Sequence, residues 1–359
     1  MILAIADLLL SLGLGLALIS LLAPAAIRLG LEDRPCQRKT HQGHVPLIGG
    51  LVIFLCTSGL SMALPWHSLD PQTGVFLASG AVLVVVGALD DRFGLDVRLR
   101  MVIEAMAATL MVFGAGLWIS NLGNLLGVGQ IHMPIWLGYP FTLVAVFGIL
   151  NAMNMIDGMD GLAGGISLMA LLILLCLMPP DATVHGLAPL LLGGLLAFLL
   201  CNLQILPFMP KIFLGDAGSK LLGLALVWFL ILAAKNPNLA EGGMAPATAL
   251  YLVGLPLFDM VATTIRRGRR GVSPFQPDRT HIHHILQGLG WRPRRVILVI
   301  LGLALAINLL GVAFTLAKLP DAVQFAVFFA LYLTYSRVTG RLLARGETRG
   351  PIPSPVASR

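Results

Sequence analysis

Charged residues are scarce in this chain. Asp, Glu, Lys and Arg make up 11% of its 359 residues, aromatic residues make up 7%, and hydrophobic residues make up 57%. The mean hydropathy is +0.89. A soluble domain carries far more charge on its surface, so this composition excludes a soluble enzyme and indicates a protein with many membrane spans.

Cysteine and the common nucleotide-binding motifs are rare or missing as well. The four cysteines form no C-x-x-C pair and three of them lie in apolar runs, so neither disulfides nor a zinc site is indicated. Neither G-x-x-x-x-G-K-[ST] nor a G-x-G-x-x-G after a strand occurs. If the chain binds phosphates, the loops of a membrane bundle must bind them.

Long apolar runs dominate what is present. We predict an all-α, polytopic membrane bundle with about 11 transmembrane helices, or 10 if one of the short, Gly-broken segments does not cross. The expected spans are residues 2–23, 47–64, 74–89, 101–119, 139–156, 162–178, 186–206, 221–234, 244–264, 296–317 and 323–339. We assign residues 1–345 to a single transmembrane domain and the Pro-containing residues 346–359 to a disordered cytoplasmic tail.

The basic residues indicate the orientation of the chain. Of 24 Lys and Arg residues, 22 lie in loops on one side of the predicted membrane, and only Lys235 and Lys318 lie on the other. The positive-inside rule then places the N-terminus outside and the C-terminus in the cytoplasm. We expect a multi-pass membrane protein. Its net charge of +7 reflects topology and contact with anionic lipid, and we expect no nucleic-acid partner.

Acids that lie next to span ends gather on the cytoplasmic side, whereas the acids of the outer loops do not cluster. The gathered acids are Asp90, Asp91, Asp157, Asp160, Asp216 and Asp278. A carboxylate at the membrane boundary is costly and is therefore usually functional. This asymmetry predicts that the chemistry takes place on the cytoplasmic face.

The polar segment 151–165 separates two apolar runs. Its residues Asn151, Asn154, Asp157 and Asp160 recur at every third position. A regular α-helix would not align all four, whereas a tighter winding, eased by the glycines between them, would. Amide and carboxylate oxygens that face one point suit a hard divalent cation. A plain polar loop between two spans is the alternative.

Two further motifs carry acids. Asp90 and Asp91 end the third apolar run, and two adjacent carboxylates repel each other unless Mg²⁺ or a cationic side chain such as Arg100 lies between them. The glycines of F-L-G-D-A-G-S (213–219) allow backbone N–H groups to approach a phosphate at the start of the next helix. Asp216 in this motif is placed as a helix N-cap or as a metal ligand.

The loop from Arg266 is strongly basic. It contains R-R-G-R-R (266–270) and D-R-T-H-I-H-H (278–284), in which His281 and His284 would share one face of a helix. Three histidines with nearby arginines form a site for anionic oxygens. Zinc is the alternative ligand, but the usual set of further Cys or acid ligands is missing.

These elements together fit phosphoryl transfer. That reaction needs a metal on the phosphate oxygens, cations that take up developing charge, and groups that hold the reactants in line. A site at the edge of the bilayer suits a soluble phosphate donor and a lipid-linked acceptor. A transporter or lipid flippase is a distant alternative, because its ionisable groups would lie near mid-bilayer, often in two related halves.

The ordered motifs also resemble a known family. L-D-D-R-F (89–93), N-A-M-N-M-I-D-G-M-D-G (151–161), F-L-G-D-A-G-S (213–219) and D-R-T-H-I-H-H (278–284) are similar to those of the polyprenyl-phosphate N-acetylhexosamine-1-phosphate transferases. The likeness begins at the loop after the first span, near Asp33. It is greatest to the members that transfer N-acetylglucosamine 1-phosphate from UDP-N-acetylglucosamine (UDP-GlcNAc) to undecaprenyl phosphate.

The resemblance implies a role for each motif. Asp216, with Asn154 as a second ligand, would hold Mg²⁺, or Mn²⁺ in its place, against the UDP pyrophosphate, and Phe213 would pack on uracil. Further acids with catalytic or supporting roles would be Asp90, Asp91, Asp157 and Asp160. Groups that bind phosphate oxygens or stand beside them would be Arg100, Arg266, His281, His283, His284 and Asp278, with His281 also among the catalytic residues.

Several alternatives remain open at this point. The donor could be another UDP-N-acetylamino sugar, such as UDP-N-acetylfucosamine or UDP-MurNAc-pentapeptide. Asp90 could act as a base, as a supporting charge or as a covalent nucleophile. Gly94 stands where close members of the family often carry an acid, although Asp96 follows two residues later. A homodimer is compatible with the sequence.

Overall fold

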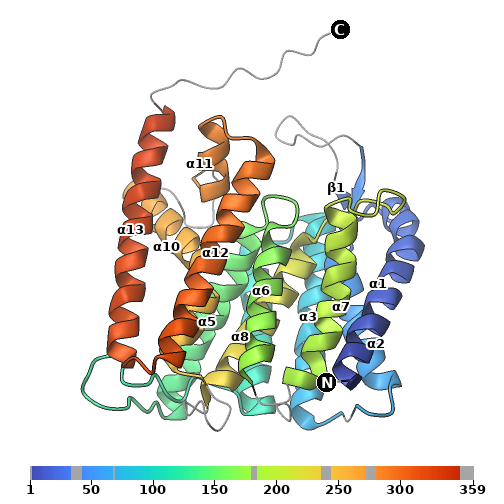
Figure 1. The fold of residues 1–359 in the computed structure, drawn as a ribbon. Helices are drawn as coiled ribbons and strands as arrows, with labels where there is room; N and C mark the ends of the chain where they lie inside the picture. Colours follow the sequence, from blue (N-terminus) through green and yellow to red (C-terminus); the bar gives the residue numbers. More distant parts are fainter. Residues whose placement is uncertain are drawn as a thin grey trace.

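A bundle of helices makes up almost all of the described chain (Figure 1). The structure is a computed structural model and describes residues 2–33, 43–67, 69–178, 184–235, 244–271, 273 and 280–347. The elements are α1 (Ile2–Arg28), β1 (Glu32–Asp33), β2 (Val45–Pro46), α2 (Gly49–Ala63), α3 (Pro71–Phe93), α4 (Val97–Thr109), the π-helical η1 (Leu110–Gly114), α5 (Ile135–Ile156), α6 (Leu162–Leu177), α7 (Val184–Asn202), α8 (Gly215–Lys235), α9 (Pro246–Leu252), α10 (Gly254–Arg269), α11 (Ile282–Gly288), α12 (Pro293–Leu316) and α13 (Asp321–Glu347). Strands β1 and β2 pair antiparallel.

The predicted apolar segments coincide with helices. The fourth segment is α4 continued by η1, and the ninth is the pair α9 and α10, which bends by 76° at a break. Five helices, α1, α3, α5, α8 and α12, are long and apolar enough to cross a membrane, and the bent pair counts as a sixth. Helices α2, α6 and α7 are apolar but shorter. The prediction of an all-α, multi-pass membrane protein is thus confirmed.

Both small strands and α11 lie at one end of the bundle, which we call the sheet end (Figure 1). Helix α1 starts at the opposite end, and α13 finishes at the sheet end. The tail predicted to be disordered begins inside α13, which extends to Glu347; residues 348–359 lie outside the described residues.

Helix α8 is the central helix of the bundle, and 89% of the residues in its apolar stretch are buried. It begins at Gly215, six residues before the predicted start of this span, so Asp216 and Lys220 belong to the helix and not to a loop. Two glycines of neighbouring helices allow its first turn to sit between them. A Cβ atom on Gly50 of α2 or on Gly87 of α3 would overlap the backbone of α8.

Backbone hydrogen bonds join the segment before α8 to the start of α2. The N–H of Phe213 donates to the carbonyl of Pro46 at 2.9 Å, and the N–H of Gly49 donates to the carbonyl of Phe213 at 2.9 Å. The N–H of Gly50 then donates to the carbonyl of Leu214 at 3.1 Å. These bonds fix the start of α8 at the sheet end.

Candidate active site

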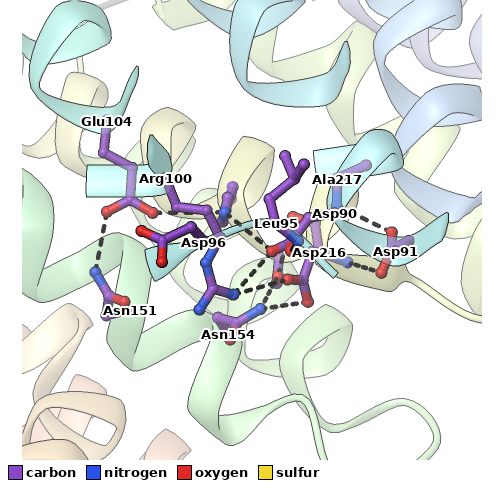
Figure 2. A network of polar contacts seen from close by, with 12 residues as sticks. Asp90, Asp91, Leu95, Asp96, Arg100, Glu104, Asn151, Asn154, Asp216 and Ala217 are labelled. Atoms are coloured by element: carbon purple, nitrogen blue, oxygen red, sulfur yellow. Dashed lines mark hydrogen bonds and ion pairs between the residues drawn. The ribbon is translucent and has the colours of Figure 1, made fainter. Parts of the chain in front are cut away.

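Asp90, Arg100 and Asp216 meet (Figure 2) near the end of α3 and the starts of α4 and α8, which lie at the sheet end of the bundle. The guanidinium Nη1 of Arg100 lies 2.8 Å from Oδ2 of Asp90 and 3.7 Å from Oδ2 of Asp216. Asp90 is 5% exposed, whereas Asp216 and Arg100 are each 29% exposed. One cation therefore bridges two carboxylates at a point that remains open to solvent.

Three helix ends bring these groups together. Asp90 lies in the last turn of α3, which ends because Gly94 adopts φ 64° and donates its N–H to the carbonyl of Asp90. Gly94, which stands where close members of the family often carry an acid, thus serves as the C-cap at which the chain turns from α3 towards α4. Asp96 accepts from the N–H of Arg98 and caps α4, and one turn later Arg100 points back to Asp90.

Asp91 faces a different direction from Asp90. Its carboxylate accepts the backbone N–H of Asp216 at 3.0 Å and that of Ala217 at 3.5 Å, and so caps the N-terminus of α8 (Figure 2). Gly215 has φ +71°, and a Cβ atom there would lie 2.5 Å from Oδ2 of Asp91. The acid that orders α8 is thus Asp91, and the carboxylate of Asp216 remains available within the site.

The prediction that four residues of segment 151–165 face one point is wrong. Helix α5 keeps its ordinary winding and ends at Ile156, so successive members point to different partners. Asn154 Nδ2 donates to Oδ1 of Asp216 at 2.8 Å, whereas Asn151 Nδ2 donates to Oε2 of Glu104 at 3.1 Å. Asn154 alone of the two asparagines reaches Asp216.

A buried ion pair lies behind this cluster. Lys220 of α8 and Glu104 of α4 are 5% and 4% exposed, and Nζ of Lys220 lies 3.5 Å from Oε1 of Glu104. The same Nζ lies 3.9 Å from Oδ2 of Asp90. Through Lys220 the pair adjoins Asp90, although the sequence motifs did not include these two residues.

The loop after α5 carries the remaining acids. Asp160 pairs with Lys211, whose Nζ lies 2.6 Å from Oδ2, and the same ammonium lies 5.3 Å from the ring centroid of Phe213. Loss of solvent, together with the nearby acids Asp216, Asp91 and Asp160, raises the pKa of Asp157 to about 8. The nearby carboxylates contribute to this shift by repulsion, which a bound cation would reduce.

The residues present fit a magnesium ion. Asp216, whose side chain is 29% exposed, supplies carboxylate oxygens, and Asn154, 2.8 Å from it, carries an amide oxygen that would add a second hard donor. Mg²⁺ is usually held by one or two carboxylates together with water and substrate phosphates. Within the described ranges, no group of three or more His, Cys, Asp or Glu side chains could hold a metal by itself.

The histidines lie on the other side of the Asp157 loop. His281 precedes α11, and its ring stacks on that of His283 with centroids 5.9 Å apart. A Cβ atom on Gly158 would lie 2.6 Å from Cε1 of His283, so this ring packs directly against the loop. Burial, with a smaller effect of His284, lowers the pKa of His283 to about 3, and His283 is therefore neutral. Asp278 lies outside the described residues.

Arg266 contacts protein groups in this structure. Its guanidinium donates to the carbonyl of Thr280 at 2.6 Å, to the hydroxyl of Thr263 at 2.9 Å and to that of Thr339 at 3.2 Å. The next residue, Arg267, approaches Nε2 of His281 at 3.3 Å. Arg266 thus joins α10 to α13 and to the segment before α11.

Sequence reasoning missed four buried residues near the predicted groups. They are Glu104, Lys220, Asp259 and Tyr335. Each is a polar group inside a segment classed as apolar or at the margin of one, and a buried polar residue within a span is the signal that would have found them.

Carboxylates, an amide and an arginine thus gather at one end of a helical membrane bundle, and the sequence comparisons show that the protein is a transferase. The model of the family described as "Glycosyl transferase family 4" matches residues 73–234, which include Asp90, Asn154 and Asp216. The chain belongs to this family.

Three relatives from the comparison share one name, "Undecaprenyl-phosphate alpha-N-acetylglucosaminyl 1-phosphate transferase". The protein from Yersinia pestis is 34% identical over 315 residues, covering 86% of this chain and 84% of the relative. The protein from Salmonella typhi is 36% identical over 318 residues, with the same coverage. The protein from Haemophilus influenzae is 37% identical over 317 residues, covering 87% of each chain.

Proposed function

We propose that this protein transfers N-acetylglucosamine 1-phosphate from UDP-GlcNAc to undecaprenyl phosphate. The products are undecaprenyl-pyrophosphoryl-GlcNAc and UMP, and this is the first lipid-linked step of an envelope polysaccharide such as O-antigen. The observation that carries the proposal is the meeting of Asp90, Arg100, Asn154 and Asp216 at one end of a membrane bundle. The relatives named above act on this lipid acceptor.

The reaction is a single displacement at phosphorus. An oxygen of the lipid phosphate attacks the β-phosphorus of UDP-GlcNAc and forms a new P–O bond. The bond between that phosphorus and the oxygen bridging to the α-phosphorus breaks, and UMP leaves with the electron pair. A phosphate monoester has its second pKa near 6 and is largely dianionic at neutral pH, so the nucleophile needs little help from a base.

The acids of the site would bind the cofactor and position the reactants. Asp216 and Asn154 would hold Mg²⁺, or Mn²⁺, and the ion when bound neutralises charge on the pyrophosphate. Arg100 already lies between Asp90 and Asp216, where its guanidinium would orient both carboxylates and donate hydrogen bonds to phosphate oxygens. Phe213 would pack on the uracil ring, and the residues around His281 would bind phosphate oxygens from the far side of the Asp157 loop.

An apolar cavity of about 450 Å³ lies between α5, α8, α9, α10 and the loop after η1, with Gly148, Val227 and Met260 among its lining residues. Asn121 and Lys235 also line it, and Lys235 ends α8 at the end of the bundle opposite to Asp216. The cavity is therefore separate from the acids of the proposed site.

The proposed topology has 11 crossings, with the N-terminus outside, the tail in the cytoplasm and the site on the cytoplasmic face of the inner membrane. An odd number of crossings agrees with α1 starting and α13 finishing at opposite ends of the bundle (Figure 1). Because the basic loops lie at the sheet end, the positive-inside rule supports a cytoplasmic site.

The test measures UMP release by the purified full-length protein with UDP-GlcNAc, undecaprenyl phosphate and Mg²⁺, across a panel of UDP-sugars. We expect release with UDP-GlcNAc and its loss on chelation of the metal. Release only with UDP-N-acetylfucosamine or UDP-MurNAc-pentapeptide would transfer the assignment to that donor. Asp216→Asn should lose most turnover while the protein still folds. Asp70→Asn, at the opposite end of the bundle, is the matched control because asparagine also caps α3.

A further inference from the structure

Asp259 is the most enclosed carboxylate that the proposed reaction does not use. It lies on α10 and is 1% exposed. Three donors surround it: Nδ1 of His281 at 2.7 Å, the backbone N–H of Ile282 at 2.9 Å and the hydroxyl of Tyr335 at 2.8 Å. A buried carboxylate in a membrane bundle is retained when its function offsets the cost of burying it.

The partners of the His281 ring define its tautomer. An ionised carboxylate can only accept, so the hydrogen on the ring lies on Nδ1, which faces Asp259. Arginine can only donate, and Arg267 Nη2 lies 3.3 Å from Nε2 of the same ring, so Nε2 accepts. Both contacts require the same neutral form of the ring. The side chain of His281 is 7% exposed, so the contacts also hold its plane.

We infer that Asp259 is a positioning residue that acts through His281. It fixes the ring with Nδ1 protonated and Nε2 directed towards Arg267, and it stabilises the positive charge that the ring gains when Nε2 takes up a proton from water, the form in which Nε2 can donate to a phosphate oxygen. The inference rests on the proposed function, because His281 matters only if this end of the bundle handles phosphates.

The alternative is a purely structural role. Asp259 also accepts the N–H of Ile282 at the start of α11, and Tyr335 connects it to α13. A residue that only held these helices together would affect folding whether or not His281 was present. The two roles therefore separate in a double-mutant cycle.

The cycle compares Asp259→Asn, His281→Gln and the double variant in the UMP-release assay, with Tyr335→Phe as the matched control. Asp259→Asn should lower kcat by about 10- to 100-fold with little change in KM for UDP-GlcNAc, as removal of an orienting partner of a functional histidine commonly does. In the His281→Gln background the same change should cost almost nothing. Tyr335→Phe removes one donor but leaves the ring contact, and it should keep most of the turnover.

Equal losses from Asp259→Asn in both backgrounds would overturn the inference, as would wild-type turnover in the single variant. If Asp259→Asn does not fold, the wild-type protein still gives an answer. Labelling of the histidines with ¹⁵N, with the His281 signals assigned against His281→Gln, should show Nδ1 protonated and Nε2 not; the reverse pattern overturns the inference. Failure of the proposed function would appear separately, as wild-type protein that releases no UMP from any UDP-sugar.

Discussion

The buried pair of Lys220 and Glu104 provides a sharp test of how the site is held. The proposed variants are Lys220→Met, Glu104→Leu and the double variant that carries both changes. Each single change leaves one charge without its main partner inside the bundle, whereas the double change replaces both charges with apolar groups. The prediction is strong coupling between the two positions.

The magnitude follows from the geometry. Two unit charges 3.5 Å apart attract by about 5 kcal/mol at an effective dielectric constant of about 20. Removing one partner of a buried pair commonly costs 3–5 kcal/mol, and replacing both with well-packed apolar side chains is often neutral or stabilising, so roughly these values are expected here. Because both side chains are about 5% exposed, solvent screening scarcely reduces this attraction.

The two single variants should differ in how much stability they lose, because the charge left behind has different neighbours in each. Glu104→Leu leaves Lys220 beside Asp90 at 3.9 Å, so the ammonium keeps a counter-charge. Lys220→Met leaves Glu104 with the neutral amide of Asn151 at 3.1 Å and with the weaker, more distant attraction of Arg100. Lys220→Met should therefore be the more destabilising change.

The assay is reversible unfolding of the purified protein in mixed micelles, in which the free energy of unfolding is measured for the wild type and the three variants. The expected coupling energy is about 3–5 kcal/mol, with the double variant close to the wild type. Single-variant effects that add within about 0.5 kcal/mol would show that the pair does not interact and would refute the reasoning.

Other predictions concern how the acid end is built. Asp91→Asn keeps an oxygen that can accept from the first turn of α8 and should preserve stability, whereas Asp91→Ala should lower the free energy of unfolding by about 1–2 kcal/mol. If both variants lose turnover equally and keep wild-type stability, the negative charge of Asp91 serves the reaction and not the helix cap. Gly50→Ala should lower the free energy of unfolding by about 1–3 kcal/mol, because its Cβ would overlap the backbone of Gly218. Gly59→Ala on the same helix meets nothing within 4 Å, so its free energy of unfolding should stay close to that of the wild type. Measurement of both glycine variants by the same unfolding assay checks this, and similar stabilities would contradict the proposed packing.

Much of the architecture could be predicted from local signals. Hydropathy is a property of single segments, so the apolar runs matched helices such as α1 and α12 closely. The motifs that carry Asp90 and Asp216 stand next to span ends, and span ends that share a face must gather at one end of a bundle.

What could not be predicted depends on tertiary contacts. Asp90 and Asp91 look alike in sequence, yet one pairs with Arg100 while the other caps α8. Lys220 was counted as a loop residue because hydropathy placed the start of the span at residue 221. The role inferred for Asp259 depends on its contact with His281, which lies 22 residues away in the sequence.

The regular spacing of the polar segment was also misleading. A repeat of three residues aligns side chains only where the backbone winds more tightly than an α-helix. Helix α5 keeps its normal winding until it ends at Ile156, so Asn151 turns to α4 and Asn154 to α8. The geometry of the following loop then directs Asp160 to Lys211.

The main-chain bonds between Phe213 and the start of α2 have a consequence for motion. Because α8 is tied to α2 through carbonyls and amides of Pro46, Gly49 and Leu214, neither helix can shift at its sheet end without the other. Asp216, in the first turn of α8, therefore keeps its position relative to the start of α2 whenever either helix moves.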